Sequence, residues 1–359
     1  MEQRTTVGID LAKEVFAVCV MDAAGTVIER QRLRRAAFER WLQSLQGTCV
    51  VAMEACSSAH HWARLLAARG HTVRLITPAF VTPFRKSGKN DDHDAEAIAI
   101  AARQPTMRFV PVKTVEAQAT LCWHRARQGW IKERSALITR LRGLLAEFGI
   151  VIARSADRLR KALPALTDDD TTLPPALRPL VLEAIEQLRA LDARLERCDA
   201  EVAAHARSDP AAQRLRQVLG VGPLTSSAVV ATVPNAQLFQ NGRRFSAWLG
   251  ITPRQHSSGG KTKLGRSTRH GDAYLRTLLV QGARSTLQSA LRTEPAKASH
   301  LQRWIVALYQ RKGYHKTLVA IANKHARIAW VLLARGENYD PNAWQRSARI
   351  QRSASTATA

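Results

Sequence analysis

Residues 7–10 read Val-Gly-Ile-Asp, and residues 49–54 read Cys-Val-Val-Ala-Met-Glu. Each is a short apolar run that ends on an acid, and such a run predicts a β-strand. Asp10 and Glu54 are therefore expected at the ends of two strands. Carboxylates at strand ends can converge with others on a helix face to bind a pair of hard cations.

The segments around these two runs predict an α/β domain. Three strands come first, and helices and strands then alternate. The expected strands are 7–10, 15–20, 27–33, 49–54 and 72–76, with a turn at 23–26 and helices at 38–45 and 59–69. This is the order of an RNase H-like (RuvC-like) fold, whose active-site acids lie where the first and fourth strands end.

Two further acids, Asp91 and Asp94, lie three residues apart just before a segment, 95–103, that is predicted to be helical. Mg²⁺ prefers oxygen ligands and is often held by a few carboxylates together with substrate phosphate. Taken singly, each acid is better explained by a turn, a helix cap or an ion pair with a lysine. Their combination in strand order favours a metal site. A one-residue shift of register would put Asp92, or His93, in place of Asp91.

The composition predicts a partner that is a polyanion. The 359 residues are 45% hydrophobic, enough for two or three domains with real cores, and they carry a formal net charge of +25. Neutralising phosphates releases counterions, so such a charge favours nucleic acid. A membrane surface is the competing polyanion, but no lipidation motif, signal peptide or long apolar run supports it. The five cysteines include no CxxC pair, which fits reduced cytosolic thiols and argues against a structural zinc site. The expected location is the cytoplasm, in association with the nucleoid.

A long helical segment is predicted from about residue 117. Leucines and a phenylalanine at 137, 141, 144, 145 and 148 form an apolar stripe at helical spacing. Residues 168–170 and 174–175 make a break, and a second helix over 181–202 keeps the three-four alternation of a heptad repeat. The two helices are expected to form an antiparallel coiled-coil arm or to mediate dimerisation; an ordinary core stripe is the alternative.

Residues 218–223, Val-Leu-Gly-Val-Gly-Pro, lie between two predicted helices and resemble a helix-hairpin-helix turn. In such a turn, Gly220 and Gly222 would let backbone amides approach a phosphate. From residue 242 to the end there are 21 Lys and Arg against 4 Asp and Glu, a net charge of +17. The C-terminal part therefore carries most of the excess charge, and residues 347–359 are predicted to be disordered.

Residues 253–261 read Pro-Arg-Gln-His-Ser-Ser-Gly-Gly-Lys and are predicted to form a basic loop. The loop could hold a phosphate through its backbone amides, or Ser258 could attack phosphorus as a nucleophile. A flexible polar loop without chemistry is the alternative. The spacing does not match a nucleotide-binding P-loop.

A predicted nucleic-acid face adds basic residues dispersed through the C-terminal segments. Besides Arg254 and Lys261, its members are Lys263, Arg266, Arg269, Arg276, Lys316, Lys324 and Arg327. Trp304, Tyr309 and Trp330 could stack on bases, although aromatic residues at helical spacing are more often part of a core.

These motifs together resemble the DEDD transposases of insertion-sequence family one-ten. The N-terminal resemblance is carried by residues 8–10 with Glu54 and by 89–95, and the C-terminal one by 219–223, 249–253, 257–261 and 322–330. The Ser-Ser-Gly-Gly-Lys form indicates the eleven-eleven subgroup. The resemblance covers about residues 7–339. It departs from the usual Lys-Thr-Asp pattern at one place, where Asn90 replaces the threonine.

The resemblance implies a recombinase that cuts and rejoins the DNA of a mobile element. Asp10, Glu54, Asp91 and Asp94 would bind Mg²⁺, two ions being expected and Mn²⁺ an alternative. Ser258 would be the nucleophile, with Ser257 as runner-up. The partners implied are target and donor DNA, a structured non-coding guide (bridge) RNA, and further copies of the chain, as dimers that form a tetramer.

The expected organisation is an RNase H-like catalytic domain over 1–112, a helical arm over 113–208, a mainly α-helical transposase domain over 209–346 and a tail over 347–359. Two other functions remain open from the residues alone. A RuvC-like structure-selective nuclease would need the acids and no serine. A non-catalytic nucleic-acid-binding protein would need neither, although the four intact acids disfavour it.

Overall fold

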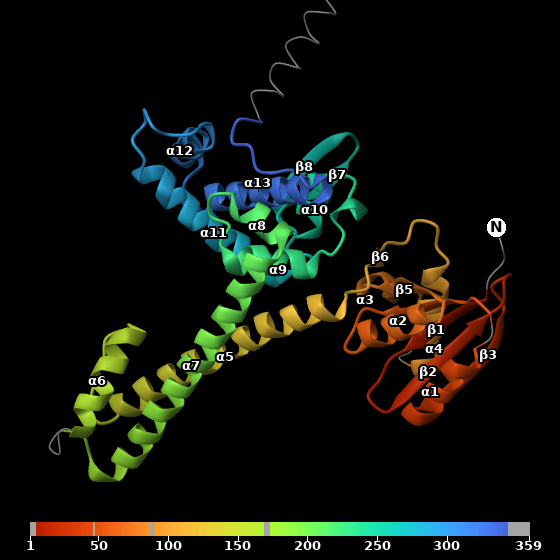
Figure 1. The fold of residues 1–359 in the computed structure, drawn as a ribbon, viewed down its shortest axis with the longest axis horizontal. Coiled ribbons are helices and arrows are strands. Elements are labelled where there is room, and N and C mark those ends of the chain that lie inside the picture. Colours follow the sequence, from red (N-terminus) through yellow and green to blue (C-terminus); the bar gives the residue numbers. More distant parts are fainter. Residues whose placement is uncertain (1–4, 46, 87–89, 169–172, 344–359) are drawn as a thin grey trace, which may run out of the picture. The chain divides into compact units, whose positions relative to one another are not determined.

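The computed structural model describes residues 5–45, 47–86, 90–168 and 173–343. The chain divides into two compact units, Met1–Val115 and Glu116–Ala359, and Figure 1 labels their helices and strands. The predicted tail at 347–359 and part of the predicted break at 168–170 lie outside the described residues. Within the described ranges no helix is long and apolar enough to cross a membrane.

The first unit is built on a mixed six-stranded sheet, in the order β3-β2-β1-β4-β5-β6. The strands β1, β4 and β5 are parallel, and the other pairs are antiparallel. The strands are β1 (Thr6–Asp10), β2 (Val15–Met21), β3 (Val27–Arg34), β4 (Val50–Glu54), β5 (Thr72–Ile76) and β6 (Phe109–Val110). The predicted α/β class is confirmed. Strand β6 was not predicted, because two residues carry no readable alternation.

Helices cover both faces of this sheet. Helices α1 (Arg35–Ser44) and α2 (Ala59–Ala68) bury Phe38 and Trp62 against one face, with Phe16 stacked on Phe38 at 4.3 Å between ring centres. Helix α4 (Asp91–Ala102) is rich in alanine and packs on the other face. Short turns, α3 (Pro78–Val81) and η1 (Thr82–Phe84), precede it.

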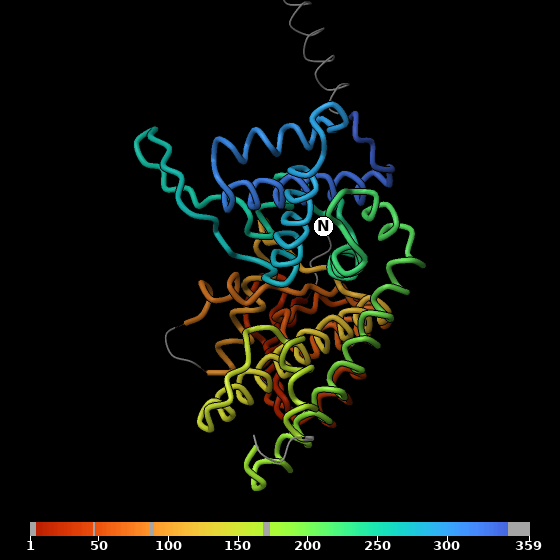
Figure 2. Tube along the Cα trace, turned by 90° about the vertical axis from the view of Figure 1, so that its left-hand side faces the viewer, coloured from red at the N-terminus to blue at the C-terminus, as the bar shows by residue number. Residues whose placement is uncertain are grey.

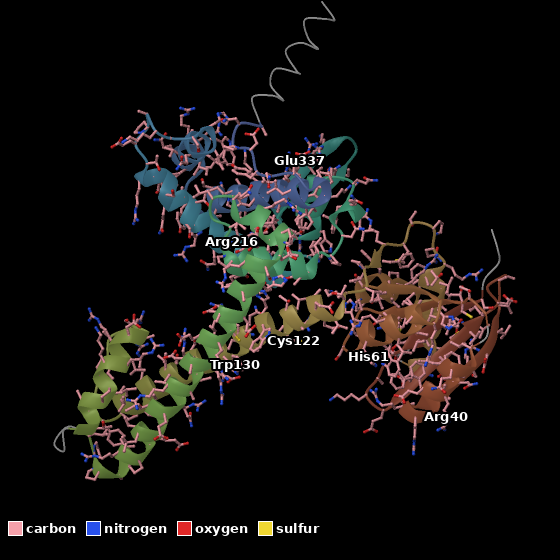
Figure 3. All side chains as sticks on the ribbon, in the orientation of Figure 1. Arg40, His61, Cys122, Trp130, Arg216 and Glu337 are labelled. Carbon is pink, nitrogen blue, oxygen red and sulfur yellow. The ribbon has the colours of Figure 1, made fainter. Side chains whose placement is uncertain are left out.

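Three helices open the second unit: α5 (Val115–Ala146), α6 (Ala156–Asp168) and α7 (Arg178–Ser208). Helices α5 and α7 pair antiparallel, with Arg134 Nη1 2.9 Å from Asp192 Oδ1. They share an apolar core with α6, against which Trp130 packs (Figure 3). Helix α6 was not predicted as a separate element. In the predicted stripe, Leu144 is exposed although it lies within α5, and Phe148 is exposed beyond the end of α5 at Ala146.

Six helices pack around a second core in the same unit. They are α8 (Pro210–Arg216), α9 (Pro223–Thr232), α10 (Gly242–Trp248), α11 (Ala273–Arg292), α12 (His300–Lys312) and α13 (Tyr314–Arg335), with a short turn, η3 (Ala236–Leu238), before α10. Helix α5 joins this core through the buried His124, whose ring nitrogens lie 2.8 Å from the Tyr274 hydroxyl and 3.0 Å from Ser227 Oγ. The largely helical character predicted for this part is confirmed.

Residues 253–267 form a β-hairpin, not the predicted loop. Strand β7 (Pro253–Ser258) pairs antiparallel with β8 (Lys261–Ser267). The two residues between them, Gly259 and Gly260, have φ values of 55° and 75°, the left-handed conformations that a tight hairpin turn requires. Figure 2 shows the hairpin projecting from the helices of its unit. The prediction failed because nearly all hairpin residues are exposed, so neither strand alternates between apolar and polar residues.

Candidate active site

The sheet brings the first two predicted acids together. Asp10 and Glu54 are the last residues of β1 and β4, which pair in parallel with Ile9 opposite Met53. Alternate side chains of a strand face opposite sides of the sheet. Since Ile9 and Met53 are buried in the core beneath α1 and α2, Asp10 and Glu54 belong to the face that α4 covers.

Helix α4 supplies the other two acids from its first turns. It begins at Asp91, four residues earlier than predicted, because Asn90 caps it by accepting a hydrogen bond from the Asp92 amide at 3.3 Å. The replacement of Thr by Asn at this position therefore keeps a capping residue. Asp91 and Asp94 are three residues apart within the helix, which puts them on one face.

Gly8 allows α4 to lie directly against β1. A Cβ at this position would be 2.2 Å from the carbonyl oxygen of Ala95 and 2.7 Å from the amide nitrogen of Ala99. No side chain fits in that space, so a glycine is required for the close approach that carries Asp94 to Asp10. This role of Gly8 was not predicted from the sequence, although a glycine inside a strand often marks a close approach of another backbone.

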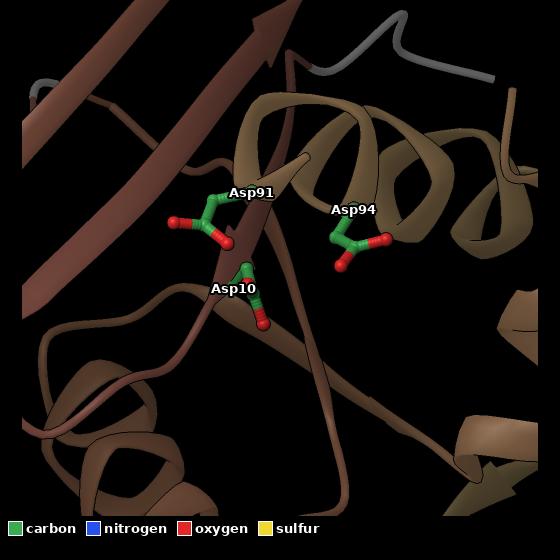
Figure 4. A group of neighbouring side chains, drawn as sticks. All are labelled: Asp10, Asp91 and Asp94. Carbon is green, nitrogen blue, oxygen red and sulfur yellow. The ribbon is translucent and has the colours of Figure 1, made fainter. Parts of the chain in front are cut away.

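Three of the four acids form one cluster. Asp10, Asp91 and Asp94 each offer a carboxylate oxygen, and these oxygens all lie within 4.8 Å of one another (Figure 4). Glu54 is not a member of this trio. His93 is not a member either, and it contributes no nitrogen to the cluster.

Arg85 connects Glu54 to the cluster. Its Nη2 donates a hydrogen bond of 3.0 Å to Glu54 Oε1, and its Nε lies 2.9 Å from Asp94 Oδ1. The second contact is an ion pair without hydrogen-bond geometry, so among the described residues the buried Asp94 Oδ1 has no hydrogen-bond donor. Sequence reasoning missed Arg85, because one arginine in a basic chain carries no pattern that marks it.

The cluster holds more negative charge than Arg85 can compensate. Burial raises the pKa of Asp10 from 3.8 to about 6, and the charges of Asp94, Glu54 and Asp91 add to this effect while Arg85 opposes it. Like charges at short range and loss of solvent both disfavour the ionised form. A carboxylate in this state gains stability from any cation that enters the cluster.

Asp92 lies outside the cluster and pairs with β3. Arg32 donates to both its oxygens, from Nε at 2.8 Å and Nη2 at 2.9 Å, and this hydrogen bonding holds the Asp92 pKa below its usual value. The structure therefore groups Asp91, and not Asp92, with Asp10 and Asp94.

The donor set fits a hard divalent cation. All the grouped ligand atoms are carboxylate oxygens, the preference of Mg²⁺ and Mn²⁺, and no cysteine or histidine is included. The buried Asp94 Oδ1, which pairs with Arg85 and receives no hydrogen bond from the described residues, is an acceptor at the same place. Which residues bind the ion stays a prediction.

In the second unit, the hairpin places its two serines on opposite faces. Gln255 Nε2 donates to Ser257 Oγ at 2.8 Å, so these two share one face. By strand alternation, Ser258 shares the other face with His256, opposite Lys261 and Lys263. Ser258 is exposed next to the glycine turn.

The hairpin and its neighbours also carry most of the predicted basic face. Arg254, Lys261, Lys263 and Arg266 lie on β7 and β8, and Arg269 follows with a φ of 55°. Arg276 is used differently, because its Nη1 donates to the Leu249 carbonyl at 3.1 Å and so anchors the end of α10 to α11.

The two glycines of the predicted helix-hairpin-helix turn differ in their surroundings. The turn does lie between two helices, α8 and α9. Gly220 has a φ of 84°, and a Cβ there would be 2.0 Å from Thr286 Oγ1 and 2.5 Å from the Gly282 carbonyl oxygen. Its glycine is thus required for packing on α11. Gly222 faces open space, and a phosphate contact there stays a prediction.

All three predicted stacking residues are partly buried and pack against the core. Trp330 Nε1 donates to the carbonyls of Ala236 and Phe239, at 3.0 and 3.1 Å, and Tyr309 packs against the same core. Trp304 lines a groove beside α13 together with Lys316, Lys324 and Arg327.

The sheet, the acidic cluster and the basic hairpin are the features of a nucleic-acid-processing enzyme. Similarity to known proteins identifies its family. Residues 212–299 match the family described as "Transposase IS116/IS110/IS902 family", and residues 7–150 match a DEDD transposase family of the IS110 type. Together these matches extend over both units.

Curated proteins are similar over nearly the whole chain. A probable family 20 transposase of Pseudomonas aeruginosa is 44% identical, over 93% of this chain and 98% of its own. A putative transposase of Sinorhizobium fredii is 40% identical, over 94% and 86%. The transposase for insertion sequence element IS1111A of Coxiella burnetii is 39% identical, over 94% and 92%.

The chain belongs to the IS110/IS116/IS902 family of insertion-sequence transposases. It is therefore a DNA-cutting and DNA-rejoining enzyme. Transposases of the DEDD family use a divalent metal, and the acidic cluster is the part of the described chain that can bind one.

Proposed function

We propose that the first unit is an RNase H-like nuclease domain whose metal site is formed by Asp10, Glu54, Asp91 and Asp94. Three antiparallel strands followed by two parallel ones support this, together with acids at the ends of β1 and β4. The observation that carries the proposal is the approach of the Asp10, Asp91 and Asp94 oxygens to within 4.8 Å of one another.

Two Mg²⁺ ions, for which Mn²⁺ could substitute, would be held by these four carboxylates. When bound, the ions would polarise the scissile phosphate and stabilise charge on its oxygens. Asp10, whose carboxylate interacts with the charges of the other three acids, would be one of the residues that hold them. Glu54 would have to exchange its hydrogen bond with Arg85 for a metal contact, since the guanidinium holds its Oε1.

Ser258 is the proposed nucleophile. Its oxygen would form a bond to phosphorus as the bond to the bridging DNA oxygen breaks; the serine proton goes to a base, and the leaving oxygen gains a proton. The resulting phosphoserine diester conserves the energy of the broken bond. A DNA hydroxyl can then attack it and release the serine, so no ATP is needed.

The hairpin supports Ser258 over Ser257. Ser258 shares a face with His256, and an imidazole can accept a proton from a neighbouring hydroxyl. Ser257 is instead engaged by the Gln255 side chain. Positive charges from Lys261 and Lys263 on the Ser258 face would attract the phosphate.

The remaining parts of the proposal rest on the family. A structured non-coding RNA would pair with target and donor DNA, and the basic residues of the second unit would hold the nucleic acids. We further propose that residues 113–208 act as an arm that joins copies into dimers and a tetramer, and that residues 209–346 carry the serine.

Detection of a covalent protein–DNA adduct on a denaturing gel tests this function. The protein would be incubated with Mg²⁺, the DNA of its element ends and the adjacent non-coding RNA. We expect an adduct with the wild type and with Ser257→Ala, and none with Ser258→Ala or Asp10→Ala. Cleavage that needs Asp10 but neither serine, without an adduct, would mean hydrolysis and would overturn the nucleophile assignment.

A further inference from the structure

A groove of about 1080 Å³ runs through the second unit beside α13. One wall is a face of α13 formed by Lys316, Ala320, Lys324 and Arg327. The intervals of four, four and three residues put these side chains in one row, about 16 Å long at the helical rise. Helix α12 forms the facing wall with Trp304.

The groove is electrostatically polarised along its length. The basic end is formed by Lys316, Lys324 and Arg327 on α13 and by Arg243 on α10. The acids that line it, Glu337 and Asp340, follow α13 at the other end. Glu337 lies 3.7 Å from Arg335, which offsets part of its charge.

Lys324 is the most informative residue of the basic end. Its Nζ lies 4.7 Å from the centre of the Trp304 ring, a cation–π contact. The side chain is half-buried, and its pKa is lowered by burial and by the neighbouring Arg327. Within the described ranges no carboxylate forms an ion pair with it. A half-buried ammonium without an anion is a site that an incoming phosphate would satisfy.

From this arrangement we infer that the groove binds an unpaired nucleic-acid strand, with a phosphate on Lys324 and the adjoining base against the Trp304 indole. Sequence-tolerant strand binding combines such cations with an aromatic surface. A duplex keeps its bases stacked inside and can offer only phosphates, so it cannot use an indole set inside a groove. DNA and RNA strands share the chemistry required.

The groove reaches the base of the hairpin that carries the proposed nucleophile. Pro253, the first residue of β7, is part of its lining, and the same strand ends at Ser258. A strand held at Trp304 would therefore be anchored at the base of the hairpin whose tip carries the proposed nucleophile. The inference rests on the proposed function in one respect only, because the unpaired segments would be produced by strand exchange.

Binding can be measured without cleavage, in EDTA, by fluorescence polarisation with the full chain. The probes would be labelled oligo-dT and oligo-U of about 12 nucleotides, within the usual site size for single strands, and a duplex of the same length. Trp304→Leu keeps an apolar side chain, and Lys324→Met keeps the length of the stem. Lys312→Met, an exposed change on α12 outside the groove, is the matched control.

We expect Trp304→Leu to weaken the binding of at least one single strand by roughly 5- to 100-fold, because one base-stacking contact is lost. The affinity for the duplex should stay within about twofold of wild type. Lys324→Met should reduce the slope of log affinity against log salt by about 0.7, the loss of one phosphate contact on a single strand. Lys312→Met should change single-strand affinity less than about twofold. The ratio of dT to U binding identifies which strand the groove prefers.

Photocrosslinking locates the strand. A 5-iodouracil probe should crosslink to the α12 segment containing Trp304, and the crosslink should be absent in Trp304→Leu. Unchanged single-strand affinity in both groove variants, equal losses for duplex and single strand, or crosslinks confined to other segments would each overturn the inference. The adduct assay does not depend on strand binding in the groove. If the groove variants gave a wild-type yield of adduct alongside any of these results, strand binding by the groove would be rejected and the proposed function would stand.

Discussion

Arg85 links Glu54 to the acidic cluster of Asp10, Asp91 and Asp94, with its Nη2 donating to Glu54 Oε1 at 3.0 Å and its Nε 2.9 Å from Asp94 Oδ1. The guanidinium thus lies between two acids that are proposed to bind metal. It reduces the repulsion among four carboxylates, and it is also a cation that a metal ion would have to displace from Glu54.

Arg85→Gln is expected to tighten divalent metal binding by roughly three- to tenfold, because a competing cation is removed from Glu54 and Asp94. Titration calorimetry with Mn²⁺ and Mg²⁺ measures this. Arg30→Gln is the matched control, since Arg30 pairs with Glu96 and not with the cluster. Weaker binding in Arg85→Gln would mean that the guanidinium orients the ligands and does not compete.

Asp10→Asn is expected to stabilise the metal-free protein at alkaline pH. The folded-state pKa of Asp10 is about 6, above its ordinary 3.8, so the fold favours the protonated form. The contribution of protonated Asp10 to the stability of the fold is complete below about pH 4 and is lost as pH rises through 6. Asp10→Asn removes this loss of stability, which we put at about 1–2 kcal/mol at pH 8 after allowance for solvent screening of a partly exposed group.

Urea unfolding in EDTA at pH 4 and pH 8 tests this expectation. Asp92→Asn should behave in the opposite way, because its pKa is held low by Arg32 and its charge therefore stabilises the fold above its unfolded pKa. Saturating Mg²⁺ should reverse the order of wild type and Asp10→Asn. Equal stabilities at both pH values would show that the cluster does not strain the metal-free fold.

Gly8→Ala should destabilise the first unit by about 1–3 kcal/mol and weaken metal binding, because its Cβ would push α4 away from β1 and carry Asp94 from Asp10. Gly143→Ala in α5 is a control with open space around it and should stabilise by about 0.5–1 kcal/mol. Urea unfolding combined with Mn²⁺ titration separates the two effects. Normal metal affinity in Gly8→Ala would mean that the cluster tolerates movement of the helix.

Gly220→Ala and Gly222→Ala should separate packing from nucleic-acid contact in one turn. Gly220→Ala meets Thr286 and requires a left-handed backbone, so a loss of more than about 2 kcal/mol of stability is expected. Gly222→Ala has room, and the protein should fold normally. If Gly222 approaches a phosphate, DNA affinity falls in Gly222→Ala alone; unchanged DNA affinity at normal stability would reject that contact.

The sequence predicted the elements of the first unit well because most of its strands are buried on at least one face. Residues 7–10 and 49–54 read as strands from their apolar runs, and both observed strands end on the predicted acids. The hairpin at 253–267 was not predicted, because a two-stranded ribbon exposed on both faces has no apolar periodicity. The predicted start of α4 was four residues too late, because Asn90 was not recognised as the residue that caps the helix.

By itself, the sequence determined which acids end strands, which residues are basic, and the family. The tertiary structure decided the rest of the candidate site, because that depends on contacts between segments far apart in the chain. The pairing of Asp92 with Arg32 on β3 sets it apart from Asp91. The bridge from Arg85 to Glu54 and the fit of Gly8 against Ala95 likewise join residues whose separation in sequence hides their proximity. Local patterns record periodicity and charge, whereas a binding site is defined by distances across packed elements.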